Sequence, residues 1–166
     1  MPKTYEPIAT QTLGSTQTSI TFSSIPQTYT DLILISSARR GITGSGGDLI
    51  AGQLNSDTGS NYSRTGLFGD GSTASSGRST NISYFFAGIC GDNKYSTSIC
   101  QIQNYSNSST FKTALARLSD GSDQGVSAQV NLWRSTSAIS SIYIFTTAGS
   151  GFFTGSTFTL YGIKAA

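Results

Sequence analysis

The chain has few of the side chains that enzymes use for proton transfer and nucleophilic attack. It contains no His, so a Ser-His-Asp or Cys-His arrangement cannot form within it, and transition metals lose a common ligand. A Ser-Lys pair stays open through Lys94, Lys112 or Lys164, but with 29 Ser some serine near a lysine is expected by chance. We therefore expect a protein that is not an enzyme and uses no cofactor.

Glycoside hydrolysis needs a pair of carboxylates, and eight Asp and Glu residues are available. Most of them stand in turn sequences, as in Asp70-Gly71, Gly91-Asp92 and Asp120-Gly121. Asp beside Gly is typical of tight turns, because the carboxylate accepts hydrogen bonds from the backbone that follows it. We interpret these acids as turn residues and not as a catalytic pair.

One segment, Asn55-Ser-Asp57-Thr-Gly59-Ser-Asn61, places oxygen-bearing side chains at alternate positions and resembles a calcium loop faintly. It has a single carboxylate and lacks the closing bidentate Glu that such loops use, so affinity would be poor. A hydrogen-bonded turn leading into Tyr62 is the preferred interpretation, with a metal site as the lesser alternative.

Composition favours strands over helices. Ser (29) and Thr (22) together make 51 of 166 residues and Gly adds 19, whereas only 11% of residues are charged. Hydroxyl side chains compete with helical hydrogen bonds but suit strands and turns. The hydrophobic content of 36% is too high for a disordered chain, and the length suits one domain over residues 1–166.

Charge and hydropathy argue against two classes of partner. The net charge is +2, and Arg39-Arg40 is the one adjacent basic pair, so no basic stripe predicts nucleic-acid binding. No apolar run approaches the ~18 residues of a transmembrane helix, and the first six residues do not resemble a secretory signal. We expect no nucleic-acid partner, no membrane and no export from the cell that makes the protein.

Apolar residues alternate with polar ones in segments separated by Gly, Ser, Asn or Pro, which is typical of strands. In the last segment Phe158, Leu160 and Gly162 share one face. In the cleanest segment, we expect Val126, Ala128, Val130 and Leu132 to point inward and Ser127, Gln129 and Asn131 outward. The expected strands are Thr18–Ser23, Asp31–Arg39, Asp48–Leu54, Tyr62–Phe68, Asn81–Cys90, Thr97–Tyr105, Thr110–Leu118, Val126–Leu132, Ile139–Thr147 and Ser156–Ile163.

These segments predict an all-β fold, an antiparallel, jelly-roll-like β-sandwich of about ten strands, with a closed barrel as the lesser option. The nearly continuous apolar run Asp31–Arg39 predicts a central strand that is covered on both faces. We expect loops at Gly41–Gly47 and Asp70–Thr80. If the strands around Cys90 and Cys100 form a hairpin, the two cysteines are not opposite each other, so we favour reduced, buried thiols over a disulfide.

The aromatic residues suggest where the protein contacts a partner. Trp133 falls on the register that we expect to face outward, beside Arg134. Phe152 and Phe153 are consecutive and cannot both point inward on a regular strand, so one of them should pack against another subunit. We predict Tyr5, Trp133, Phe152 and Phe153 as interface residues.

Four segments carry a resemblance to a known family: Tyr5–Gly14, Ile20–Leu32, Asp57–Ser63 and Phe158–Ala166. Together they resemble small β-rich virion proteins of tailed bacteriophages, notably phages of cyanobacteria and marine bacteria. The resemblance spans nearly the whole chain and implies a structural role in the virion, after assembly in the host cytoplasm. Members range from tail-fibre components to capsid decoration proteins, and no catalytic residue is carried over.

Two functions follow from this resemblance. A capsid decoration or cement protein would bind the major capsid protein as a homo-oligomer, with a trimer as the expected state. A tail-fibre or receptor-binding module would instead present the two predicted loops to a host surface glycan. We favour decoration, because the chain shows no coiled-coil, collagen-like or fibrous segment and is expected to be whole at 166 residues. A free carbohydrate-binding domain is a third, weaker option.

Overall fold

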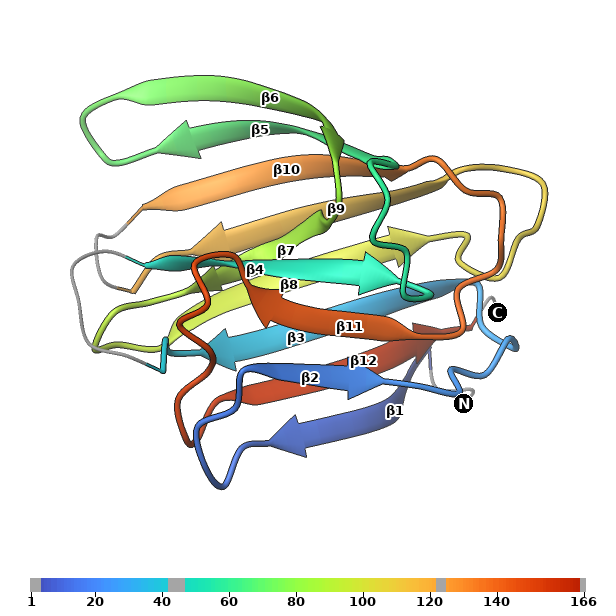
Figure 1. Cartoon of the computed structure of the whole chain (residues 1–166), viewed down its shortest axis with the longest axis horizontal. Coiled ribbons are helices and arrows are strands. Elements are labelled where there is room, and N and C mark those ends of the chain that lie inside the picture. The colour runs from blue at the N-terminus through green and yellow to red at the C-terminus, as the bar shows by residue number, and fades with distance from the viewer. Residues whose placement is uncertain (1–3, 42–46, 122–124, 165–166) are drawn as a thin grey trace.

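The computed structural model describes residues 4–41, 47–121 and 125–164, and within them the chain forms strands and no helix. There are twelve strands in this described part rather than about ten (Figure 1). Their bounds are β1 Tyr5–Thr12, β2 Ser19–Phe22, β3 Asp31–Ala38, β4 Asp48–Leu54, β5 Tyr62–Gly69, β6 Ala74–Ile82, β7 Phe85–Cys90, β8 Ser96–Gln103, β9 Lys112–Ser119, β10 Val126–Trp133, β11 Ile142–Thr146 and β12 Thr157–Ile163.

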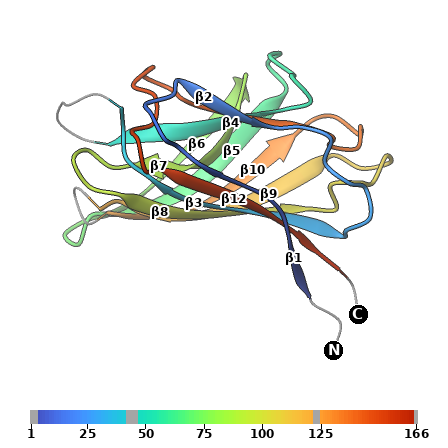
Figure 2. The ribbon, with the colours of Figure 1, turned by 90° about the horizontal axis from the view of Figure 1, so that it is seen from below.

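The strands form two antiparallel sheets. The large sheet has the order β1-β12-β3-β8-β9-β10-β5-β6, and the small sheet has the order β2-β11-β4-β7. Figure 2 shows the two layers one above the other, and in Figure 1 the small sheet lies in front of the large one while the β5–β6 hairpin projects beyond it. The all-β sandwich predicted from the sequence is thus confirmed, in an arrangement of eight and four strands.

The core lies between the two sheets. The alternation predicted for the last strand is confirmed, because Phe158, Leu160 and Gly162 of β12 are buried and the residues between them are only half-buried. A side chain at Gly162 would collide with the ring of Tyr29, whose atoms lie 2.3–2.5 Å from the position of an added Cβ. Glycine here lets Tyr29 cover this end of the core.

The sequence analysis does not predict two of the strands, β1 and β6. Residues Asp70–Thr80 were expected to form a loop, but most of them belong to β6, which pairs with β5 along its length. Residues 74–80 carry no alternation of apolar and polar side chains, so pattern alone does not indicate this strand. The turn before it is held by Asp70, whose Oδ1 accepts hydrogen bonds from the N–H groups of Ser72 (2.8 Å) and Thr73 (2.6 Å). Residues 42–46 of the other predicted loop lie outside the described residues.

Two further expectations are corrected. The strand β3 is central, but it is not covered on both faces, because Ile35 is exposed on the side away from the small sheet. Cys90 and Cys100 are free and buried, as favoured, yet they lie on β7 and β8 in different sheets. The hairpin that we considered between their strands does not form. These apolar strands pack across the sandwich instead of pairing edge to edge.

Candidate interaction surface on the large sheet

The strand β10 faces the opposite way from the sequence prediction. Ser127, Gln129 and Asn131 are buried, with Asn131 only 1% exposed. Val126, by contrast, is 60% exposed, and Val130 is also exposed. The polar side of this strand therefore faces the small sheet, and its apolar side faces away from the molecule.

The edge of the small sheet explains this inversion. β7 ends that sheet, so its outer backbone groups have no neighbouring strand to bond. Asn131 supplies the missing partner, because its Oδ1 accepts the Phe86 N–H (2.8 Å) and its Nδ2 donates to the Phe86 carbonyl (3.0 Å). Ser98 of β8, in the large sheet, bonds the same edge of β7: its Oγ accepts the Ile89 N–H at 3.1 Å. Asn131 faces inward because a bare backbone edge lies opposite it.

The outcome is an uncovered outer surface on the large sheet, which we call the open face. It bears every second side chain of the eight strands, on the side away from the small sheet. Two neighbouring rows cross it: Gln101, Leu115, Val130 and Thr65 in one, and Ile99, Arg117, Ala128 and Leu67 in the other. Residues directly opposite each other on antiparallel strands share a face, so each row is continuous.

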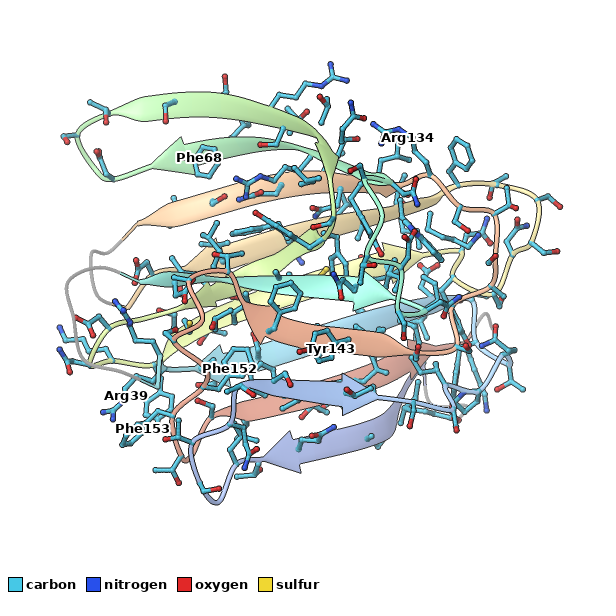
Figure 3. All side chains as sticks on the ribbon, viewed as in Figure 1. Arg39, Phe68, Arg134, Tyr143, Phe152 and Phe153 are labelled. Carbon is cyan, nitrogen blue, oxygen red and sulfur yellow. The ribbon has the colours of Figure 1, made fainter. Side chains whose placement is uncertain are left out.

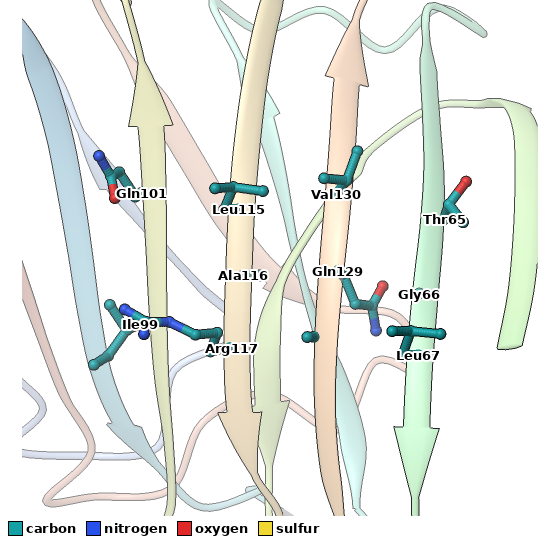
Figure 4. A pocket seen from close by; sticks show the side chains of 11 residues that line it. Thr65, Gly66, Leu67, Ile99, Gln101, Leu115, Ala116, Arg117, Gln129 and Val130 are labelled. Carbon is teal, nitrogen blue, oxygen red and sulfur yellow. The ribbon is translucent and has the colours of Figure 1, made fainter. Parts of the chain in front are cut away.

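These two rows line a groove of about 710 Å³ over β8, β9, β10 and β5 (Figure 4). Leu67 is 64% exposed, and Leu115 and Val130 are also exposed. A contiguous apolar surface left in water is typical of an interaction site in a soluble protein. We therefore take the groove and the open face around it as the candidate functional site.

The chemistry of the groove suits binding. Arg117 is the charged residue among those that line it, and Figure 4 shows its side chain extending toward Ile99. Gln101 is fixed in place, since its Nε2 donates to Asp31 Oδ2 at 3.1 Å. The lining residues therefore offer apolar contact, one guanidinium and amide or hydroxyl hydrogen bonds, without a carboxylate or thiol to move protons.

Trp133, a predicted interface residue, lies in the core. It is 3% exposed, because it shares the inward register of Asn131. Its ring stacks on Tyr62 with a centroid distance of 6.2 Å, and its Nε1 donates to Asp57 Oδ2 at 2.6 Å. The outward orientation expected for Trp133 is therefore wrong.

Phe152 and Phe153 do point in different directions, as their adjacency requires. Phe152 is fully buried, with its ring edge-to-face on Phe158 at 4.8 Å. Phe153 is half-buried, and the guanidinium of Arg39 lies 3.5 Å from its ring centroid (Figure 3). Tyr5 is 55% exposed on β1, the far edge of the large sheet from the groove. Of the four predicted interface residues, Tyr5 and Phe153 thus have side chains that are accessible at the surface, whereas Trp133 and Phe152 are buried. The structure does not bring the four residues together.

The segment Asn55–Asn61 is a hydrogen-bonded turn, as preferred. Asp57 accepts hydrogen bonds from the Gly59 N–H (2.9 Å) and from Asn61 Nδ2 (2.9 Å to Oδ2), besides Trp133. Desolvation raises the pKa of Asp57, but these hydrogen bonds outweigh it, and the net pKa is lowered. Within residues 4–41, 47–121 and 125–164, no group of three or more His, Cys, Asp or Glu residues is placed to hold a metal ion.

One signal in the sequence could have revealed the open face. Trp133 shares its register with Ser127, Gln129 and Asn131, and a Trp is the most costly side chain to leave in water. Had Trp133 set the direction of β10, the apolar residues of that strand would have been placed outside.

Comparisons with known proteins add little to this picture. Among the described residues, no apolar helix reaches the length needed to cross a membrane. No protein-family model and no curated protein matches the chain. A solved structure of a protein of unknown function from Shewanella oneidensis MR-1 aligns over 98% of this chain and 77% of its own length, with 9% identity and a TM-score of 0.26. The comparisons thus assign no family to the chain.

Proposed function

We propose that the chain is a non-enzymatic structural protein of a bacteriophage virion, a jelly-roll-like sandwich that decorates the capsid and stabilises the head lattice. In this role it acts as a homo-oligomer and binds the major capsid protein through the open face. The phage context comes from the resemblance of four sequence segments. The observation that carries the binding role is the apolar groove over β5, β8, β9 and β10.

The size of the open face fits a protein partner. Eight strands spaced ~4.8 Å apart give a width of about 34 Å, and seven or eight residues at ~3.3 Å give a length of about 25 Å. The resulting ~850 Å² matches the ~800 Å² that each partner contributes to a standard protein interface. Few charges on this face also favour packing against a flat protein surface, because little desolvation of ions is required.

A glycan-binding tail module is the alternative that this face favours less. Sugar-binding faces rely on aromatic rings beside hydrogen-bonding groups, and no aromatic residue lines the groove. One of the two loops assigned to that alternative, Asp70–Thr80, is largely the strand β6. The number of copies per virion distinguishes the tail role from decoration.

The first measurement is the number of copies per virion, by quantitative mass spectrometry of purified particles against the major capsid protein. Hundreds of copies are expected for a decoration protein. A few to a few dozen copies would contradict decoration and support the tail.

Binding through the open face can be tested with purified protein and capsids assembled without it. The double variant Leu115→Glu with Val130→Glu places two carboxylates in the groove, and we expect roughly 100-fold weaker co-sedimentation with capsids, because two buried apolar contacts of about 1.5 kcal/mol each are lost. The matched control is Tyr143→Glu, an exposed position on the small sheet. Equal binding of the groove variant and the control would contradict the assignment of the open face.

A further inference from the structure

The strand β6 forms one free edge of the large sheet. It pairs with β5 on one side and has no neighbour on the other in the described chain. From Ala74 to Thr80 its register with β5 is regular, and the irregularity lies only at its end, near Asn81. This segment therefore presents a flat row of backbone N–H and C=O groups at alternate residues, which is a template for another extended strand.

The other three sheet edges are each protected. β1 carries Pro7, which lacks an N–H, and its register shifts between Pro7 and Ala9. β2 is four residues long. On β7, Asn131 bonds both backbone groups of Phe86, as described above. Long edges invite pairing, and natural sheets block them by these devices. β6, with nine residues, has only Arg78 as a charged side chain.

β6 also has little to hold it in place by itself. Seven of its nine residues are exposed, and it contains Gly77 and Asn81, residue types with low β propensity. Apart from Ile82 at its end, which packs against the core, its side chains bury almost no apolar area, so the order of Ala74 to Thr80 depends on hydrogen bonds to β5. A second strand on its free side would supply the complementary set of backbone bonds.

We propose that β6 pairs antiparallel with β6 of a second copy of this chain, with Gly77 opposite Gly77 on the two-fold axis. This register keeps both open faces on the same side, because residues an even number apart share a face. It places Arg78 opposite Ser76 of the other copy. Moving the axis to residue 78 would put the two Arg78 side chains together, and a register with the axis between two residues would turn one open face over. The joined sheet has sixteen strands, and edge pairing of this kind closes with two copies instead of the expected trimer.

The glycine at the axis makes this register easy to test. An added Cβ at Gly77 would meet only Phe68 Cε2 at 3.7 Å, an ordinary contact, so Gly77→Cys should fold. In the dimer its two Cα atoms lie about 4.5–5.5 Å apart, within the range of a disulfide. The matched control is Ser79→Cys on the same face, because its two copies would be about 13 Å apart. The native cysteines are buried and do not interfere.

Sedimentation velocity across a concentration series should show a monomer–dimer equilibrium, and mild oxidation should cross-link Gly77→Cys but not Ser79→Cys. Ser76→Lys places a lysine opposite each Arg78, and we expect roughly tenfold weaker dimerisation, whereas Ser76→Glu should strengthen it. Adding Arg78→Glu to Ser76→Lys should restore the dimer. A chain that stays monomeric at millimolar concentration, or dimers that neither cross-link at residue 77 nor respond to Ser76→Lys, would overturn the proposal. The test uses purified protein, so it is independent of any role in the virion.

Discussion

Replacing Asn131 by Leu should destabilise the protein even though a leucine is what an inward position on a strand normally carries. The two side chains have the same number and branching of heavy atoms, but the variant loses both hydrogen bonds to the Phe86 backbone, of 2.8 and 3.0 Å. A buried backbone group left without a partner costs about 1–3 kcal/mol, and two are left here. Burial of the leucine recovers part of this, so we expect a net loss of roughly 2–4 kcal/mol in the free energy of unfolding.

Gln129 provides the matched control, two residues away on the same face of β10. Its Nε2 donates to Ser127 Oγ at 3.0 Å, but its buried Oε1 has no hydrogen-bond partner among the described residues. Gln129→Met should therefore change stability by less than about 1 kcal/mol. Urea unfolding followed by circular dichroism measures both variants. If Asn131→Leu proved as stable as the wild type, Asn131 would not be there to satisfy the edge of β7.

Three further outcomes are expected. Because the pKa of Asp57 is lowered in the fold, its ionised carboxylate stabilises the protein at pH values above the ordinary pKa of 3.8, and this stabilisation is lost as the pH falls through the pKa of the folded state. Asp57→Asn should flatten this dependence of stability on acid pH, which can be measured by the fluorescence of Trp133, the single tryptophan. Burial raises the pKa of Cys90 and Cys100 to about 12, so a thiol reagent at neutral pH should label neither until the protein is denatured. Lys112→Met leaves two backbone carbonyls without their donor and should cost roughly 1–3 kcal/mol by thermal unfolding; no loss would contradict this role.

The sequence predicts most of the strands but not how they face. Strands such as β3, β4 and β12 are indicated by apolar content, because their side chains pack in the core. β6 is missed since it is held by backbone pairing with β5, and Ser and Gly give no pattern. A period of two shows that residues alternate, but which side is buried depends on what lies opposite. For β10 that is the bare edge of β7, which only the fold reveals.

Apart from the register of Trp133, the sequence does not predict the candidate site, for the same reason. Its groove joins residues from β5, β8, β9 and β10, which are brought side by side by the order of the sheet. The interface prediction at Tyr5, Trp133, Phe152 and Phe153 was drawn from aromatic residues with awkward patterns. Trp133 seemed to point outward because the direction of β10 was predicted the wrong way, and Phe152 lies outside the strands, in a segment that bridges to Gln17 and Arg40 and buries its ring.

The pairing of β1 and β3 with β12 bears on how the chain folds during synthesis. β12 lies between these two strands, with Tyr5 opposite Ile163 on one side and Asp31 opposite Ile163 on the other. Within the described sheet β1 pairs with β12 alone, so β1 cannot pair until β12, about 150 residues further along the chain, has been made, whereas β3 can first pair with β8. β8, β9 and β10 pair in sequence order and can form earlier, because their loops are short. We expect slow folding that starts from this meander, and a nascent chain whose early strands need protection from aggregation.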